Sequence, residues 1–246
     1  MAAFVKIFGE RHTNTNYLQQ LITLNLEVTQ LPGVAPKHLR TLERWLPFAN
    51  FRDNYFDKHF HKHLGWKHAC VDNQRLQQSD IFKQCLFLTL TKNPYAWLVS
   101  LHRRPYHYLD TITGTNFKDF LQTPWQLLPR EQITEQSLTP IELWNKKNYS
   151  YLSLASQYTL NLTSEALLEK PEQVVQHISE RICLPLKGSF QDITQSTKKT
   201  TKDRAFYKDY YLNQRWLSEY TEETLAIVNT SIDKELMQHF GYSIIS

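Results

Sequence analysis

The stretch FVKIFGERHTNTNYL, residues 4–18, decides the fold of this chain. Residues 4–8 form an apolar run of strand length, and residues 9–16 are rich in the residue types of a tight turn. Leu18 and Ile22 then repeat with the spacing of the buried face of a helix. A strand, a hydroxyl-rich loop and a helix N-terminus in this order point several backbone N–H groups and the positive end of the helix dipole at one place. The stretch therefore predicts a site for a phosphate or sulfate.

This loop differs from the P-loop of nucleoside triphosphatases, which reads G-x-x-x-x-G-K-[ST]. Asn14 stands at the second glycine position, and Thr15 and Asn16 follow it where the lysine and the hydroxyl residue would be. The lysine and magnesium contacts of ATP-binding loops are therefore not encoded. Asparagine enters left-handed backbone conformations readily, so Asn14 can still make the turn. A polar turn that binds nothing is the alternative interpretation of the loop alone.

A second junction between a strand and a helix lies further along the chain. Residues 84–91, QCLFLTLT, form an apolar run of strand length. Asn93 is a good N-cap residue and Pro94 suits the first helical position. Lys92 is thus predicted at the exit of the strand, and Ser100 two turns into the helix.

This second junction resembles that of sulfotransferases that use 3′-phosphoadenosine 5′-phosphosulfate (PAPS). In that family an arginine at the end of a parallel strand and a serine eight positions later bind the 3′-phosphate of the donor. Lys92 and Ser100 have the same spacing, within the similar setting Asn-Pro-Tyr-x-Trp-Leu-x-Ser. Lysine keeps the charge of arginine but not its bidentate geometry. The resemblance implies that Lys92 and Ser100 bind the 3′-phosphate of PAPS.

The opening loop is similar to the 5′-phosphosulfate loop of a subgroup of these enzymes. Thr13 and Thr15 match its hydroxyl positions. Where better-studied members have a lysine, this chain has His12, with Arg11 just before it, so either side chain is a candidate for the positive charge. The resemblance implies that the 5′-phosphosulfate is bound by Gly9, Arg11, His12, Thr13, Asn14, Thr15 and Asn16. A later segment, residues 158–172, is similar to the family's strand followed by Tyr-Glu-Asp-Leu, but Ser164 and Ala166 depart from that pattern.

The segment Leu64–Cys70 is predicted to be a short strand, and it resembles the place where many sulfotransferases carry a lysine and a histidine. By this match Lys67 contacts the sulfuryl or bridging oxygens, and His68 accepts the proton of the acceptor. The family's usual spacing is Lys-x-His, one residue wider. Adjacent residues on a strand point to opposite faces, so both can serve only if the strand has ended there. A hydrogen-bonded structural histidine is the alternative for His68.

A basic segment, residues 198–204, precedes two aromatic residues near the C-terminus. Sulfotransferases close over the 3′-phosphate with a basic loop late in the chain, although this one lacks the Arg-Lys-Gly triplet of the cytosolic subgroup. The resemblance implies phosphate contacts from Lys202 and Arg204, because convergent cations suit a bisphosphate. A charged surface loop is the alternative.

The length predicts one domain, residues 1–246. The two strand-to-helix junctions and the resemblance to sulfotransferases imply a three-layer α/β/α fold around a central parallel sheet of the P-loop nucleotide-binding type. A net charge of +4 suits a small anionic ligand rather than nucleic acid. No apolar run reaches about eighteen residues, so no membrane span is expected. The chain begins on a strand without a signal sequence, which predicts a cytoplasmic protein. Three cysteines without paired spacing are expected to be reduced core residues.

Four other features lead to expectations of their own. His59, His61 and His63 alternate, but no metal site is predicted, because no cysteine or carboxylate completes one. Residues 30–65 and 104–139 have weak periodicity and are expected to form the acceptor pocket. Helices are predicted over residues 139–156, from Pro171 and over 222–240. Core packing is expected for most tryptophans, with stacking on an adenine or sugar as the alternative for Trp45, Trp125 and Trp144.

The resemblance to sulfotransferases implies transfer of a sulfuryl group from PAPS to a hydroxyl or amine of a small-molecule or glycan acceptor. Catalysis is assigned to His68 as base, with Lys67 and either Arg11 or His12 stabilising charge. Two alternatives stay open: a P-loop kinase of a small metabolite, against which the missing Gly-Lys-[ST] argues, and a non-catalytic nucleotide-binding module on a degenerate sulfotransferase scaffold.

Overall fold

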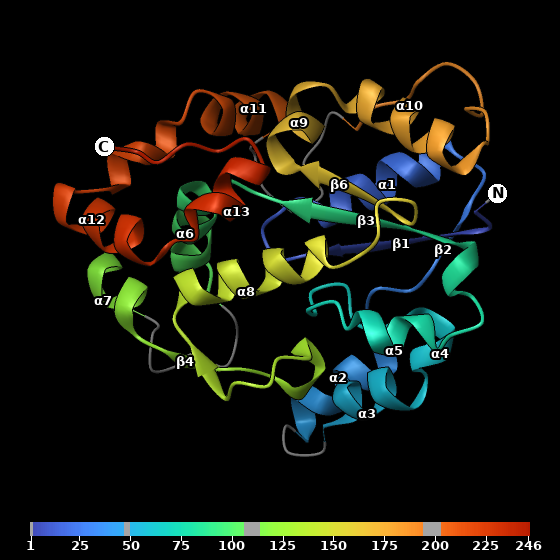
Figure 1. The fold of residues 1–246 in the computed structure, drawn as a ribbon, viewed down its shortest axis with the longest axis horizontal. Helices are drawn as coiled ribbons and strands as arrows, with labels where there is room; N and C mark the ends of the chain where they lie inside the picture. The colour runs from blue at the N-terminus through green and yellow to red at the C-terminus, as the bar shows by residue number, and fades with distance from the viewer. Residues whose placement is uncertain (1, 47–49, 106–113, 194–202) are drawn as a thin grey trace.

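A parallel sheet of four strands runs through the middle of the molecule (Figure 1). The structure, a computed structural model, describes residues 2–46, 50–105, 114–193 and 203–246. The strand order is β2-β1-β3-β6, with bounds Thr29–Gln30, Phe4–Gly9, Cys85–Thr91 and Thr159–Thr163. Gly9 pairs with Leu90, and Thr91 pairs with Thr163, so β1, β3 and β6 end at the same edge of the sheet. This edge carries the candidate site.

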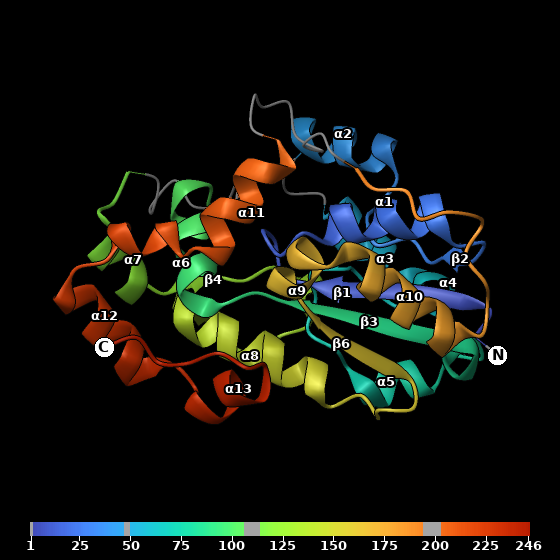
Figure 2. The same ribbon diagram turned by 90° about the horizontal axis from the view of Figure 1, so that it is seen from above.

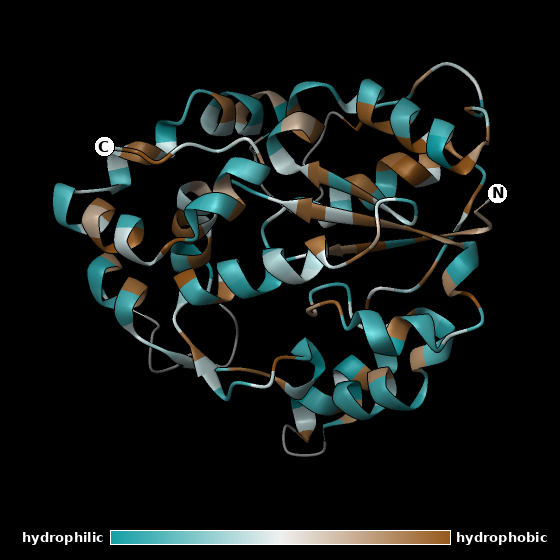
Figure 3. Cartoon of the chain, viewed as in Figure 1, coloured by the Kyte–Doolittle hydropathy of each residue, from teal (hydrophilic) through white to brown (hydrophobic). Residues whose placement is uncertain are grey.

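Helices cover both faces of the sheet (Figures 1 and 2). One face packs against α1 (Thr15–Asn25), α9 (Ser164–Glu169) and α10 (Pro171–Ile182). The other packs against α4 (Phe60–His63), α5 (Asn73–Gln77) and the end of α8 (Pro140–Leu152). The central strands β1 and β3 are largely buried and mostly apolar (Figure 3), as a sheet covered on two faces requires. The predicted three-layer α/β/α fold with a parallel sheet is confirmed.

A helical lobe lies beyond the carboxyl ends of the strands, toward which the arrows in Figure 1 point. Its core includes residues of α6 (Pro94–Arg103), α7 (Phe117–Gln122), α12 (Glu222–Ser231) and α13 (Lys234–His239). The remaining elements are α2 (Lys37–Trp45), α3 (Phe51–Lys58), α11 (Arg204–Leu212), the antiparallel pair β4 (Trp125–Gln126) and β5 (Ser137–Leu138), and 3-10 helices at Phe82–Gln84, Pro129–Glu131 and Arg215–Glu219.

Local signals set several helix starts as predicted. Asn93 caps α6 by accepting a hydrogen bond from the Tyr95 N–H at 3.0 Å, and Pro94 is its first residue. Thr139 and Glu142 form a capping box at the start of α8. That helix ends at Leu152, a turn earlier than predicted.

Three predictions about local structure are wrong. The predicted helix over residues 222–240 is two helices, because Asp233 caps α13 by accepting from the Leu236 N–H at 2.9 Å. The segment Leu64–Cys70 is a loop rather than a strand, since Leu64 and Gly65 both have positive φ, 57° and 91°. Cys70 and Cys85 are buried, but Cys183 is exposed.

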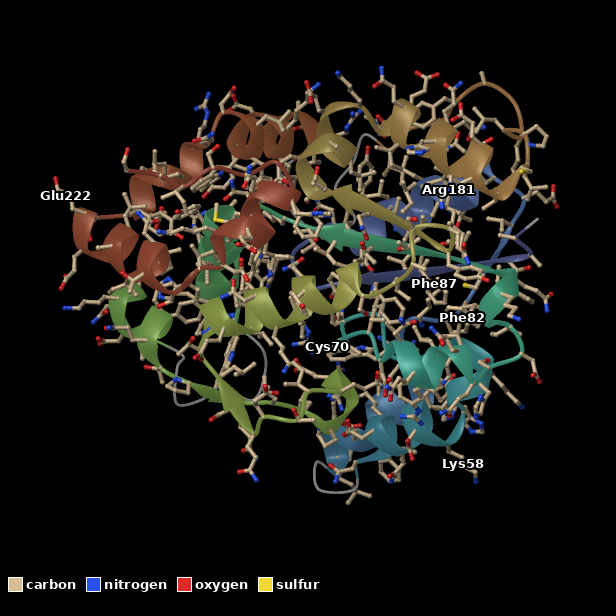
Figure 4. All side chains as sticks on the ribbon, in the orientation of Figure 1. Lys58, Cys70, Phe82, Phe87, Arg181 and Glu222 are labelled. Atoms are coloured by element: carbon tan, nitrogen blue, oxygen red, sulfur yellow. The ribbon has the colours of Figure 1, made fainter. Side chains whose placement is uncertain are left out.

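Aromatic packing accounts for much of the core. The ring centroids of Phe82 and of Phe87 on β3, both labelled in Figure 4, are 5.4 Å apart in one core cluster. Trp125 and Trp144 are buried, whereas Trp45 is 80% exposed on α2. Within the described residues, no helix is both long enough and apolar enough to cross a membrane.

Candidate functional site

The loop between β1 and α1 makes a tight turn at the edge of the sheet. Gly9 is required there, because a Cβ atom would lie 2.8 Å from the Leu90 carbonyl oxygen and 2.9 Å from Thr15 Cγ2. His12 and Asn14 both have left-handed backbone conformations, with φ of 68° and 67°. Asn14 thus takes the conformation that the sequence predicted for it.

Three hydrogen bonds hold the loop in this shape. Thr13 Oγ1 donates to the Glu10 carbonyl oxygen at 2.5 Å, and Trp97 Nε1 donates to the Arg11 carbonyl oxygen at 2.8 Å. Asn14 is the N-cap residue of α1 but does not cap it; its side chain donates instead to Ser164 Oγ at 2.8 Å. Asn14 therefore leaves the first-turn N–H groups of α1 available to a ligand.

A cavity of about 290 Å³ opens beside this helix N-terminus. The loop, the start of α1, the 67–68 segment and α11 supply most of its walls. Its lining residues are Arg11, His12, Asn14, Thr15, Asn16, Tyr17, Lys67, His68, Leu168, Ile193, Arg204, Tyr207 and Tyr211. The described parts of 30–65 and 104–139, expected to form the acceptor pocket, contribute no lining residue. Those two segments contact each other instead, through the ion pair of Arg130 with Asp53.

Lys67 and His68 both face the cavity, because the chain here is an irregular loop in which neighbouring side chains can converge. Backbone bonds fix this loop: the Gly9 N–H donates to the Lys67 carbonyl oxygen at 2.9 Å, and the Lys67 N–H donates to the Gly33 carbonyl oxygen at 3.0 Å. Lys67 Nζ donates to Asn16 Oδ1 at 2.5 Å. The structure thus brings the predicted lysine and histidine together with the anion loop.

His68 is held as a neutral imidazole with a defined tautomer. Its Nδ1 lies 2.6 Å from the Gly9 carbonyl oxygen, which can only accept, so Nδ1 carries the proton and Nε2 the lone pair. Burial, and then the charges of Lys67 and Arg11, hold the pKa of His68 well below its usual range. Burial also lowers the pKa of Lys67, to about 8.

A buried ion triad lies behind this loop, made by Lys147 of α8 with Glu10 and Glu131. Lys147 Nζ pairs with Glu10 and lies 2.7 Å from Glu131 Oε2; the side chains are at most 3% exposed. The same ammonium donates to the His68 carbonyl oxygen at 2.7 Å. Lys147 therefore connects the anion loop, through Glu10, to the backbone of the residue next to the cavity.

Arg11 and His12, the two candidates for the positive charge of the loop, contact different parts of the protein. The Arg11 guanidinium packs over the ring of Trp66, 5.2 Å from its centroid. His12 Nε2 lies 3.0 Å from the Arg104 carbonyl oxygen at the end of α6. Both residues line the cavity, so both stay candidates.

Lys92 and Ser100 form a pair next to the loop, at the end of β3. Lys92 Nζ donates to Ser100 Oγ at 2.9 Å and lies 3.5 Å from the His12 carbonyl oxygen. Lys92 is only 1% exposed. The ring of Tyr211 lies over its ammonium, with the centroid 3.5 Å from Nζ, so Tyr211 faces the cavity and the pair lies beneath it.

The two predicted cations of the late basic segment have different outcomes. Lys202 falls outside the described residues. Arg204 begins α11 and lines the cavity, where it is paired with Asp192 and donates to the Leu168 carbonyl oxygen at 3.2 Å. Tyr17 donates to the other oxygen of Asp192 at 2.7 Å. Arg204 is thus anchored by a carboxylate at the cavity wall.

Several lining residues, mainly the tyrosines, were not predicted from the sequence. Tyr207 and Tyr211 lie four residues apart on α11, and their rings stack with a centroid distance of 6.4 Å. Their spacing of four residues on a helix is the sequence signal that places both rings on one face. Of the alternating histidines, His63 is buried and accepts a hydrogen bond from the Gly65 N–H at 3.0 Å. No cluster of potential metal ligands occurs in the described part of the chain.

The chain is similar to known proteins in its structure and not in its sequence. No family model and no curated protein matches the sequence. The sulfotransferase domain of the Synechococcus PCC 7002 olefin synthase superposes with a TM-score of 0.51, over 99% of this chain and 95% of that one, at 13% identity. This chain has the sulfotransferase fold. Two further structures are similar: the sulfotransferase domain of the curacin biosynthetic pathway (TM-score 0.46, 10% identity, 100% and 99% covered) and a sulfotransferase from Alicyclobacillus acidocaldarius (0.47, 12%, 97% and 99%).

Proposed function

We propose that this chain transfers a sulfuryl group from PAPS to a hydroxyl or amine of a small-molecule or glycan acceptor. One observation supports the proposal: two candidate anion-binding groups lie side by side at the ends of the neighbouring strands β1 and β3. The first is the loop at the N-terminus of α1, and the second is the Lys92–Ser100 pair, whose ammonium lies 3.5 Å from the loop's His12 carbonyl oxygen. A nucleotide with anionic groups on both its 5′ and 3′ positions matches this arrangement.

The residues present fit such a donor. The close approach at Gly9, which a Cβ would block, leaves a turn with the first N–H groups of α1 directed outward, as a phosphosulfate group needs. We assign the 5′ group to Gly9, Arg11, His12, Thr13, Asn14, Thr15 and Asn16. We assign the 3′-phosphate to Lys92 and Ser100, with Lys202 and Arg204 as further contacts. When bound, PAPS supplies the sulfuryl group, and 3′,5′-bisphosphoadenosine is the product.

The chain's own groups then have distinct tasks. His68 Nε2, which carries the lone pair, takes the proton of the acceptor as its oxygen or nitrogen attacks. Lys67, with Arg11 or His12, stabilises negative charge on the sulfuryl and bridging oxygens. Alignment of the reactants contributes as well, since Lys67 is held by Asn16 at the helix N-terminus.

This division of tasks predicts how the rate depends on pH. Lys67 must be charged to act, and its pKa is about 8, so kcat/KM should fall as the pH rises through about 8. His68 must be neutral, and its pKa lies below the usual range, so the rate should stay level on the acid side down through 6.5. A profile of kcat/KM from pH 5.5 to 9.5 measures the alkaline fall and the level stretch through pH 6.5. In Lys67→Arg the alkaline fall should move to higher pH, since arginine stays charged; an unmoved fall would contradict the assignment.

Calorimetry tests the proposed function directly. The protein should bind 3′,5′-bisphosphoadenosine much more tightly than AMP, and equal affinity would contradict the proposal. A screen of phenol, sugar and lipid acceptors with labelled PAPS then tests transfer. Tight binding of the bisphosphate without transfer would favour a non-catalytic module, and magnesium-dependent turnover of ATP would favour a kinase. Cytoplasmic location and a single domain over residues 1–246 stay predictions.

A further inference from the structure

Tyr211 occupies the place that a phosphate on Lys92 and Ser100 would need. Its ring centroid lies 3.5 Å from Lys92 Nζ, and its hydroxyl oxygen lies 3.1 Å from Ser100 Oγ. Ser100 donates its own proton to the Ala96 carbonyl oxygen at 2.8 Å, so Tyr211 is the donor in the contact between the two hydroxyls. One side chain thus contacts both members of the pair.

We propose that Tyr211 closes the 3′-phosphate site in the free protein and leaves it only for a nucleotide that carries this phosphate. The inference rests on the proposed function, because it concerns the same donor site. By this proposal Tyr211 lowers the affinity of the site for the bisphosphate and leaves the affinity for a monophosphate unchanged, a role that no charge in the sequence indicated.

The proposal rests on two points: the Tyr211 ring excludes a phosphate from Lys92, and the contact of Lys92 with phosphate is stronger than its contact with the ring. A phosphate oxygen bonded to an ammonium lies about 2.7–2.9 Å from the nitrogen. The tyrosine ring already fills that side of Lys92, which is why Lys92 is only 1% exposed. A charge-assisted bond to phosphate is stronger than a cation–π contact, so the phosphate displaces the ring. AMP has no group that could do so, and leaves Tyr211 in place.

The position of Tyr211 links this exchange to the rest of the cavity. Tyr211 lies on α11, which also carries Arg204 and Tyr207 in the cavity wall. No residue of α11 is fully buried, although Tyr210 and Tyr211 pack against the core, so a shift of this helix breaks fewer buried contacts than a shift of a core helix would. Entry of the 3′-phosphate therefore changes the wall against which the rest of the nucleotide lies.

The test compares the nucleotide affinities of the wild type and of single and double variants by calorimetry. Tyr211→Ala removes the competitor, so it should bind the bisphosphate about 3- to 10-fold more tightly, the factor that such a cation–π contact represents, with AMP binding unchanged. Tyr211→Phe keeps the ring and should stay within about 2-fold of wild type. Tyr210→Ala is the matched control, since Tyr210 lies on the same helix as Tyr211, accepts a hydrogen bond from Arg103 of α6 and does not line the cavity. In a Lys92→Met background, Tyr211→Ala should bring no gain.

The outcomes separate the two proposals. Weaker binding of the bisphosphate by Tyr211→Ala would make Tyr211 a phosphate ligand, and an equal change for both nucleotides would make its role structural; either result overturns the inference alone. No preference for the bisphosphate in wild type and in Tyr211→Ala would overturn the proposed function as well. Hydrogen exchange gives a second measurement on the unmodified protein: the bisphosphate, but not AMP, should change exchange across residues 204–212.

Discussion

Replacing His68 by asparagine is expected to lower kcat by about 10²- to 10⁴-fold, the contribution of a general base, with little change in donor affinity. The change is chosen for its geometry. The amide nitrogen of asparagine can take the position of Nδ1 and donate to the Gly9 carbonyl oxygen, as histidine does at 2.6 Å. The substitution removes the lone pair of Nε2 and keeps the hydrogen bond to the loop. Initial rates with saturating PAPS, and calorimetry with the bisphosphate, measure the two quantities.

Two controls make this result specific. His68→Ala removes the Gly9 bond too, and should weaken donor binding as well as the rate, because the Gly9 carbonyl belongs to the anion loop. The pH profile gives the second control: what activity remains in His68→Asn should keep the alkaline fall that Lys67 causes. If His68→Asn turned over at the wild-type rate, another group would have to be the base.

Replacing Lys92 by methionine is expected to weaken bisphosphate binding by about 10- to 100-fold, the range of a charge-assisted hydrogen bond, while AMP binding stays the same. Lys92 Nζ lies next to Ser100 and 3.5 Å from the loop, so it is placed to contact a second anionic group but not the first. Methionine has a similar length and keeps the packing under Tyr211. Calorimetry with the two nucleotides measures the difference.

The matched variants are Lys92→Arg, which should recover most of the affinity, and Ser100→Ala, which should lose less than Lys92→Met because a neutral donor contributes less. A thermal melt without ligand checks that each variant folds. Equal losses for AMP and the bisphosphate in Lys92→Met would place the charge at the 5′ group and contradict the assignment.

The parts of this fold that the sequence predicted depend on contacts close in the chain. The strands over 4–9 and 85–91 are mostly apolar runs, and the start of α6 is set by Asn93 and Pro94, whose preferences need no distant partner. The loop at 64–70 was misread because its apolar residues are buried like those of a strand. The positive φ angles at Leu64 and Gly65 make this segment a loop, and a hydrophobic pattern gives no information about φ angles.

The candidate site also has a part that the sequence predicts and a part that it does not. The residues of the 9–16 loop follow from a motif, but what each one contacts does not. Asn14 bonds Ser164, and Arg204 pairs with Asp192, through approaches that the packing of α1, α9 and α11 creates. Tyr211 is the clearest case, since its relation to Lys92 exists only once α11 lies across the end of β3. Propensities and spacings carry no information about such pairs.

The shared ammonium of Lys147 has a consequence for how this protein can change over time. Glu10 and Glu131 are both buried against it, and the loss of the lysine alone would leave two carboxylates without a counter-charge in the interior. Neutralising one acid alone is less costly. Among homologues, positions 10, 131 and 147 should therefore vary as a set, with an acid lost before or together with the lysine. Substitutions at these three positions are therefore expected in a restricted order.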